Sequence, residues 1–242
     1  MKQYLLEHSA QAGRALTETQ AEQFCAYHTI LVETNKTLNL TRVPDTMEEA
    51  ADRNYLDSLT PWLMTDRLEG AKSLLDVGAG AGFPGIPLSI AMPETHVVML
   101  DSLGKRVDFL NRVIAELGLN AEAIHFRAEE AAKTTGLRER FDIVTARAVA
   151  ALPVLCELTM PFLKVGGTFI AYHGPKADEE LPQAKKAAAI LGGDAGAIVQ
   201  IAVPVPGRDW DHRLVCFPKV KPTPKAYPRK PGDPGRDPLG SR

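Results

Sequence analysis

A dense run of glycines directly after a short apolar segment constrains the fold more than any other feature of this chain. Residues 73–77 read Ser-Leu-Leu-Asp-Val, and residues 78–85 read Gly-Ala-Gly-Ala-Gly-Phe-Pro-Gly. Residues without a Cβ allow the backbone to turn tightly between a strand and a helix and to approach a ligand closely. The segment therefore predicts a strand, a ligand-binding loop and a helix of an α/β fold. The alternative is a tight turn that binds no ligand.

The spacing of these glycines argues against a dinucleotide ligand. The fingerprint GxGxxG would place its third glycine at position 83, which is Phe83, and Pro84 and Pro87 alter the start of the helix. Such a loop is poorly suited to holding a pyrophosphate at the helix N-terminus. S-adenosylmethionine carries no phosphate and needs room for an amino acid and a ribose, so the loop favours this cofactor. A nicotinamide-dependent, NAD(P)-linked oxidoreductase on the same fold is the alternative.

Short apolar segments alternate with amphipathic ones from about residue 71 onward. The predicted strands cover residues 73–77, 96–101, 123–127, 141–146 and 168–173, with two more near 197–203 and 213–217. After the second strand, apolar residues at helical spacing predict a helix that ends at Gly118. This order predicts a mostly parallel, doubly wound sheet, the Rossmann-like fold of class I S-adenosylmethionine-dependent methyltransferases.

The residues before this alternation show helical periodicity and no strand pattern. Thr17 and Gln20 have the spacing of a capping box, so a helix is expected to begin there. A second helix is predicted over residues 47–63. We therefore expect a helical region at 1–69, a methyltransferase domain at 70–217 and a tail at 218–242.

Length and composition narrow the class of protein. The 242 residues, 45% of them hydrophobic, suffice for one α/β domain and a smaller attachment. The first residues lack the apolar stretch of a signal peptide, and no apolar run approaches the roughly 20 residues that span a bilayer. We therefore expect a cytoplasmic protein without membrane contact. Cys25, Cys156 and Cys216 are far apart, which predicts neither a metal site nor a disulfide framework.

The last 25 residues are basic and rich in proline. Seven Lys or Arg against Asp233 and Asp237 give residues 218–242 a charge of +5, so the net −2 of the whole chain leaves −7 for the rest. Seven prolines in the same stretch predict an extended or disordered tail. An acidic body with a basic end is typical of proteins that contact a polyanion.

Polar residues after two of the predicted strands are candidate cofactor contacts. Asp101 ends the second strand, where a carboxylate can accept hydrogen bonds from both ribose hydroxyls, and its alternative role is a helix cap. Ala128 and Glu129 follow the third strand, where a backbone N–H and a carboxylate can bind the adenine edge. The alternative for Glu129 is a solvated side chain that opens a helix.

Three basic residues lie at the same predicted edge of the sheet. Arg147 follows the fourth strand and can pair with the methionine carboxylate or with a substrate phosphate, or else form a structural salt bridge to an acid such as Asp76. Lys105 and Arg106 lie in the first turn of a helix, where cations oppose the helix dipole by about 0.3–1 kcal/mol each. This placement indicates an external anion, and two exposed side chains without a ligand are the alternative.

The motifs together resemble one family, the small-subunit (16S) ribosomal RNA guanine-N7 methyltransferases, historically called glucose-inhibited division protein B. The resemblance covers nearly the whole chain and is most specific in the loop, where Phe-Pro-Gly-Ile-Pro at 83–87 is unusual. The other motifs that carry it are Asp101-Ser102-Leu103-Gly104-Lys105-Arg106, Ala146-Arg147-Ala148, Asn39-Leu40-Thr41, Leu56-Asp57-Ser58 and Tyr227-Pro228-Arg229.

This resemblance implies methylation of N7 of a guanine, guanine 527, in 16S rRNA of the small ribosomal subunit. With the candidates named above, it gives expected cofactor contacts at Gly78, Gly80, Phe83, Asp101, Ala128, Glu129 and Arg147. The expected RNA contacts are Asn39, Lys105, Arg106, Arg213, Arg229 and Lys230. The chain departs from the family pattern at Thr34, where a tryptophan is usual, at Asn54, where a histidine is usual, and at His173, where a lysine is frequent.

The proposed reaction needs no general base. Guanine N7 carries an in-plane lone pair and no proton, so catalysis rests on positioning, which can supply on the order of 7–11 kcal/mol. Arg147 and Asn39 are the positioning candidates. Because the major groove of A-form RNA hides N7, the target is expected in a loop or an opened region. A non-catalytic ribosome-assembly protein is the remaining alternative, and we expect a monomer.

Overall fold

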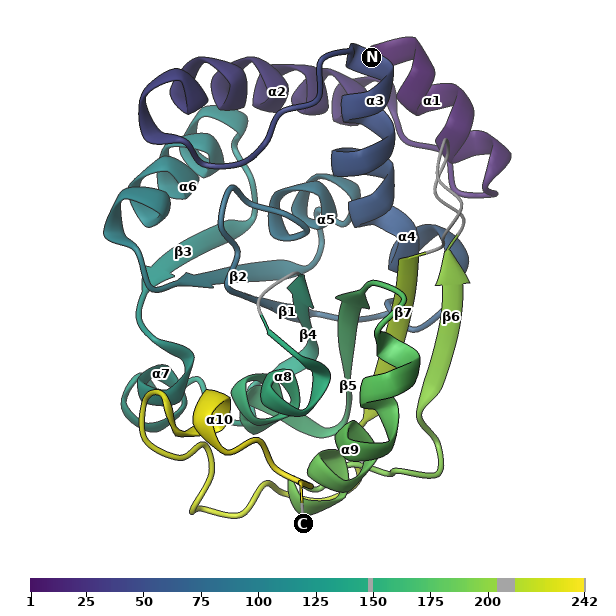
Figure 1. Ribbon diagram of the computed structural model, residues 1–242. Helices are drawn as coiled ribbons and strands as arrows, with labels where there is room; N and C mark the ends of the chain where they lie inside the picture. Colours follow the sequence, from purple (N-terminus) through teal and green to yellow (C-terminus); the bar gives the residue numbers. More distant parts are fainter. Residues whose placement is uncertain (148–149, 204–211, 242) are drawn as a thin grey trace.

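A seven-stranded sheet in the order β3-β2-β1-β4-β5-β7-β6 forms the centre of the molecule (Figure 1). The computed structural model describes residues 1–147, 150–203 and 212–241. Strands β1 to β5 are parallel, whereas β7 runs antiparallel to both β5 and β6. The predicted fold class is confirmed. The strands are β1 Ser73–Val77, β2 His96–Asp101, β3 Ala121–His125, β4 Phe141–Arg147, β5 Leu163–His173, β6 Val199–Val203 and β7 His212–Pro218.

The strand order places a crevice at the carboxyl edge of the sheet. The chain moves outward from β1 to β2 and β3 and then returns to place β4 on the other side of β1. In sheets of this kind, ligands bind outside the carboxyl ends of the strands where the order reverses. The glycine loop follows β1 and Arg147 ends β4, so both lie at this point.

Two apolar layers cover the sheet, and side chains that alternate along each strand enter them in turn. Leu74 of β1 joins one layer with helices from the first half of the chain, and Leu75 joins the other. The first layer contains α1 Lys2–Gln11, α2 Glu18–Leu38, α4 Asp57–Met64, α5 Gly85–Ala91 and α6 Gly104–Leu117. The second contains α7 Ala128–Thr134, α8 Leu152–Thr159, the 3-10 turn η2 Met160–Phe162 and α9 Ala177–Ile190. Figure 1 shows these two groups on opposite sides of the strands.

Helix α2 begins at the capping box that the sequence predicts. The Thr17 side chain accepts a hydrogen bond from the Gln20 backbone N–H while the Gln20 side chain accepts from Thr17, so the capping box of α2 is formed. The predicted helix over 47–63 is also present, but it is not uniform. It consists of α3 Met47–Ala50, a π-helical turn η1 Ala51–Leu56 and α4.

The prediction of an extended or disordered tail is wrong for the described residues up to 241. Lys219 is buried, and its ammonium group donates to Glu139 Oε1 at 2.9 Å and to the Leu163 carbonyl at 2.7 Å. The tail then packs beneath α8 and contains a short helix, α10 Asp233–Arg236 (Figure 1). Proline excludes long regular elements but not burial, and Pro228 and Pro234 are both buried.

Strand β3 begins and ends two residues before its predicted bounds. The Asn111 side chain of α6 fixes its place by accepting from the Ala123 N–H and donating to the Ala123 carbonyl. Among the described residues, no helix is long and apolar enough to cross a membrane. The same residues contain no group of three or more His, Cys, Asp or Glu that could hold a metal ion. The division of the chain at 69/70 and 217/218 stays a prediction.

Candidate functional site

A cavity of about 520 Å³ lies at the carboxyl ends of β1, β2 and β4, and we call it the loop cavity. Its lining comes from the glycine loop, the ends of β2 and β4, and two segments of the helical region. The lining residues are Leu40, Thr41, Asn54, Gly78, Ala79, Gly80, Ala81, Phe83, Asp101, Ser102, Arg106 and Arg147. Four of the predicted cofactor contacts besides Arg147 therefore share one cavity: Gly78, Gly80, Phe83 and Asp101.

The conformation of the glycine loop requires at least one of its glycines. Gly82 has φ +100°, and a Cβ at this position would lie 2.7 Å from Ile86 Cγ1 and 2.8 Å from the Tyr27 hydroxyl. No other residue type fits both the backbone angle and the space. Tyr27 of α2 is fully buried and donates its hydroxyl to the Ala81 carbonyl at 2.5 Å. The helical region thus holds the loop from outside the sheet.

Asp101 joins the loop to the start of α6. One carboxylate oxygen accepts from the Gly80 N–H at 2.8 Å and the other from the Leu103 N–H at 2.9 Å. The side chain is 3% exposed, and the Arg106 guanidinium lies 3.6 Å away. The contact with Leu103 lies just before α6, which has no side-chain cap, so Asp101 does not cap the helix. Each oxygen keeps further lone pairs, so the same carboxylate can also accept ribose hydroxyls.

Asp76 is an acid near the end of β1, directly before the glycine loop. It is fully buried, and its oxygens accept from the Gly85 N–H and from the Thr145 hydroxyl, both at 3.0 Å. Burial raises the pKa of Asp76 to about 7, against the hydrogen bonds from Thr145 and Gly85, which lower it. Asp76 therefore fixes the start of α5 against β4 and does not line the cavity.

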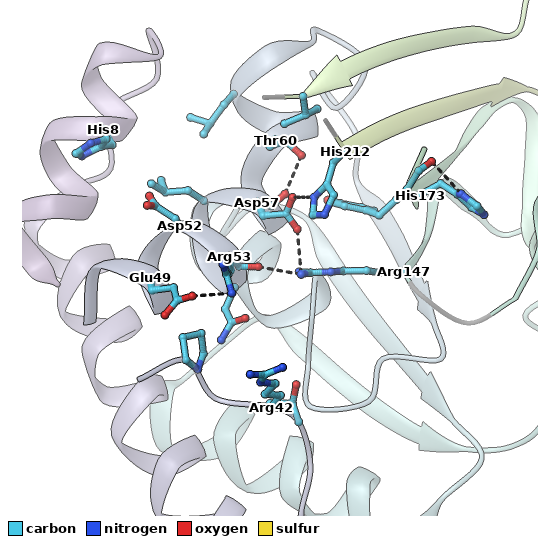
Figure 2. Close-up of a pocket in the computed structure, with 18 of the residues that line it drawn as sticks. His8, Arg42, Glu49, Asp52, Arg53, Asp57, Thr60, Arg147, His173 and His212 are labelled. Carbon is cyan, nitrogen blue, oxygen red and sulfur yellow. Dashed lines mark hydrogen bonds and ion pairs between the residues drawn. The ribbon is translucent and has the colours of Figure 1, made fainter. Parts of the chain in front are cut away.

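A second cavity, of about 720 Å³, adjoins the first on the side of the helical region, and we call it the helix cavity. Figure 2 shows residues from η1 and α4 facing the ends of β4, β5 and β7 across it. Its walls carry several acids, among them Glu49, Asp52 and Asp57, together with Arg42 and Arg53. The two cavities share three lining residues, Thr41, Asn54 and Arg147.

Arg147 is anchored to the helical region at this junction. Its guanidinium lies 3.0 Å from Asp57 Oδ2 and donates to Ser58 Oγ at 3.1 Å and to the Arg53 carbonyl at 2.9 Å (Figure 2). Asp57 also pairs with His212 of β7. A structural salt bridge was the alternative for Arg147, and it is present, with Asp57 as the acid in place of Asp76. The Arg147 side chain as a whole is 21% exposed.

Aromatic rings form the wall between α2, η1 and the loop. The ring centroids of Tyr27, Tyr55 and Phe83 lie 5.6 to 5.8 Å from one another. The Arg147 guanidinium carbon lies 5.9 Å from the centroid of the Phe83 ring. Phe83 is partly exposed and lines the loop cavity, whereas Tyr27 and Tyr55 are buried behind it. One face of the cavity is thus apolar and rigid.

Two of the predicted cofactor residues are not among those that line the loop cavity. Ala128 and Glu129 begin α7, after β3, as the sequence predicts. The Glu129 carboxylate is 9% exposed and accepts from the Gly232 N–H of the tail at 3.2 Å. The alternative of a solvated glutamate is wrong because the tail covers this side chain. Contact with adenine stays a prediction for both residues.

The predicted RNA contacts come from separate elements. Asn39 is exposed at the C-cap of α2, Lys105 is exposed on α6, and Arg106 lies beside Asp101. Lys230 is exposed on the tail. Arg213 lies in β7 opposite His173 of β5, and its Nε and Nη1 atoms are buried. These assignments stay predictions.

Arg229 has a structural partner that sequence reasoning did not foresee. Its side chain donates to both oxygens of Glu157, at 2.5 to 3.1 Å, and Glu157 is fully buried in α8. Of the motif Ala146-Arg147-Ala148, the structure describes Ala146 and Arg147. Ala148 and Arg242 lie outside the described residues.

Several residues of the site were missed because their sequence signal is weak. Asn35 accepts from the Leu40 and Thr41 N–H groups and donates to the Thr41 carbonyl, which shapes the segment that enters both cavities. Asp57 and Asn54 lie within a helical stretch where acids and amides are common. Only their place in the family motifs pointed to them, and no periodicity distinguishes them.

Comparison with known proteins identifies the family. The family model described as rRNA small subunit methyltransferase G matches residues 20–204. The chain belongs to this family. Proteins named ribosomal RNA small subunit methyltransferase G resemble it over nearly their full length. The one from Lactobacillus johnsonii is 45% identical over 232 residues, covering 95% of this chain and 96% of its own. The one from Clostridium perfringens strain 13 is 42% identical, covering 94% of each chain.

Solved structures agree on the fold. An O-methyltransferase from Bacillus cereus in complex with SAH has a TM-score of 0.55 at 16% identity, covering 90% of this chain and all of its own. Aeropyrum pernix fibrillarin with natively bound S-adenosyl-L-methionine has a TM-score of 0.52 at 18% identity, covering 73% of this chain and 84% of its own. The sheet is that of class I methyltransferases.

Proposed function

We propose that this protein transfers the methyl group of S-adenosylmethionine to N7 of a guanine in 16S rRNA, guanine 527 of the small ribosomal subunit. One observation carries the proposal: in a chain of this family, a loop cavity and a helix cavity adjoin at Thr41, Asn54 and Arg147. A reaction between a cofactor and a base needs two such spaces with one point of contact. If the glycine loop were a turn that binds no ligand, the helix cavity beside it would have no role in this account.

The residues of the loop cavity suit S-adenosylmethionine. Asp101 supplies a buried carboxylate for the ribose hydroxyls, and Phe83 supplies an apolar wall. Arg147 also lines this cavity, and because Asp57, Ser58 and Arg53 already contact its guanidinium, a cofactor carboxylate would have to share it with them. S-adenosylmethionine, when bound, supplies a methyl group on a positively charged sulfur. The glycines at 78 and 80 let the backbone approach the ligand, and no site for a pyrophosphate is needed.

The residues of the helix cavity suit a base that becomes positively charged. Arg147 is neutralised by Asp57, so it presents little net charge to the purine. Glu49 is paired with Arg53 at 2.6 Å, whereas Asp52 accepts a hydrogen bond from the neutral Tyr4 hydroxyl and favours a cation over a neutral base in the same cavity. Because N7 has no proton to lose, these side chains have only to orient the base and exclude water. Arg147 and Asn39 remain the positioning candidates.

We further propose that the protein acts as a monomer in the cytoplasm and that Lys105, Arg106, Arg213 and Lys230 contact the RNA backbone. Their contribution predicts an affinity for RNA that falls with salt concentration. Analytical ultracentrifugation with and without rRNA tests the monomer, and a dimer in both samples would contradict it.

Two measurements separate this function from its alternatives. Calorimetry with S-adenosylmethionine and with NADH should detect tight binding of the first only, and tighter binding of NADH would favour an oxidoreductase. Transfer of labelled methyl groups should then be measured on naked 16S rRNA, on small subunits and on assembly intermediates from a strain that lacks the gene. Cofactor binding without transfer to any of the three would favour a non-catalytic ribosome-assembly protein.

A further inference from the structure

Asn54 occupies the point where the two cavities meet. It lies in the π-helical turn η1, whose wider backbone interrupts the helix over residues 47–64. Turns of this kind inside helices are frequent at functional sites. Asn54 lines both the loop cavity and the helix cavity, together with Thr41 and Arg147. A group at this place is within reach of whatever passes from one cavity to the other.

The amide of Asn54 has an unused donor. The side chain is 7% exposed, and its Nδ2 has no hydrogen-bond partner within residues 1–147, 150–203 and 212–241. Buried polar groups in folded proteins nearly always have a partner. The neighbouring Arg147 is in a different position, because Asp57, Ser58 and Arg53 already occupy its guanidinium. The missing partner of Asn54 is therefore expected to arrive with a ligand.

We infer that Asn54 donates a hydrogen bond from Nδ2 to O6 of the target guanine and thereby positions N7 for methyl transfer. The inference rests on the proposed function. N7 must reach the junction of the cavities to meet the methyl group, and O6 lies beside N7 on the same edge of the base. A donor at the junction can therefore reach O6 while N7 meets the methyl group.

A neutral amide suits the charge changes of this reaction. The purine gains positive charge as N7 is methylated, so a cation at O6 would oppose the transfer. The N–H of Asn54 holds the base through O6 and leaves the N7 lone pair free to attack. Asn54 is thus a positioning residue, and it takes no proton.

The test removes the proposed hydrogen bond once by changing the RNA base and once by changing Asn54. RNA whose target guanosine is replaced by 2-aminopurine ribonucleoside keeps N7 and lacks O6. We expect the wild-type protein to lose about 10–100-fold in kcat/KM on this RNA, and Asn54→Ala to lose a similar factor on the guanine RNA. The two losses should not multiply when combined, because each removes the same bond. The intrinsic effect of 2-aminopurine on N7 is common to both proteins and cancels in the comparison.

Further variants distinguish this role from a structural one. Asn54→Asp keeps the shape without the N–H, so it should lose activity like Asn54→Ala, whereas Asn54→His restores an N–H and should recover most of it. Asn54→Ala and Asn54→His should retain the affinity for S-adenosylmethionine within about twofold and should keep the wild-type melting temperature, whereas Asn54→Asp is expected to melt lower because its carboxylate is buried. Asn120→Ala, on the surface at the start of β3, is the matched control and should leave activity unchanged.

The outcomes separate the inference from the proposed function. Losses that multiply in the combined experiment would overturn the inference, and so would weaker cofactor binding by Asn54→Ala, since the amide would then serve the cofactor. Absence of methyl transfer by the wild-type protein on guanine RNA would instead overturn the proposed function.

Discussion

The buried ion pair between Arg229 and Glu157 predicts that a single change in the proline-rich tail destabilises the whole fold. Glu157 is fully buried in α8, and its oxygens accept from Arg229 Nε at 2.9 and 3.1 Å, from Nη2 at 2.5 Å and from the Arg229 backbone N–H at 2.7 Å. Arg229→Ala removes every side-chain donor among these and leaves a buried carboxylate with one backbone N–H. Removal of one partner from a buried pair costs about 3–5 kcal/mol.

Urea unfolding followed by circular dichroism measures this loss as a lower free energy of unfolding. In a thermal melt of a chain of this size, a loss of about 3–5 kcal/mol lowers the melting temperature by roughly 6–20 °C. Arg236→Ala is the matched control in the same tail, because Arg236 is 78% exposed and lies 3.7 Å from Asp233, so it should cost less than about 1 kcal/mol. The double variant Arg229→Met with Glu157→Leu should recover most of the stability. A loss below about 1 kcal/mol for Arg229→Ala would show that the tail contributes little to the fold.

Three further variants probe the loop cavity and the acid beneath it. Asp101→Ala removes the carboxylate that holds the Gly80 N–H, so calorimetry should show S-adenosylmethionine binding weaker by about 10–150-fold, and unchanged binding would exclude a ribose contact. Gly82→Ala places a methyl group 2.8 Å from the Tyr27 hydroxyl at φ +100°, so stability should fall by at least about 2 kcal/mol in urea, and wild-type stability would contradict the loop geometry. Because burial raises the pKa of Asp76 from 3.8 to about 7, its favourable contribution is complete below about pH 4 and is lost as the pH rises through about 7. Asp76→Asn should therefore lose less stability than wild type between about pH 5 and about pH 8, and equal losses would refute the raised pKa.

Local patterns in the sequence predicted the sheet and the loop. The strand and helix around the glycines, the capping box at Thr17 and the helix end at Gly118 each depend on residues close together in the chain. Phe83 lines the loop cavity together with Gly78 and Gly80 because it belongs to the same loop, and its contact with the cofactor stays a prediction. These features follow from backbone geometry, which short segments determine.

Contacts between distant parts of the chain were not predictable in the same way. The tail was expected to be extended or disordered because its prolines were considered without the contact of Arg229 with Glu157, which lies 72 residues earlier. The pairing of Arg147 with Asp57 joins β4 to α4 across 90 residues, and the cover over Glu129 comes from Gly232. Asn54 gave no sequence signal beyond its departure from a family pattern, because its importance lies in a missing hydrogen bond that only the packed structure reveals.

Mapping of the methylated atom tests the central claim most directly. Small subunits from a strain that lacks the gene are incubated with the protein and labelled S-adenosylmethionine, and the rRNA is then digested and analysed by mass spectrometry. The account predicts a single methyl group per 16S rRNA, at N7 of guanine 527. A methyl group on another atom or another nucleotide, or none on any RNA form, would contradict it.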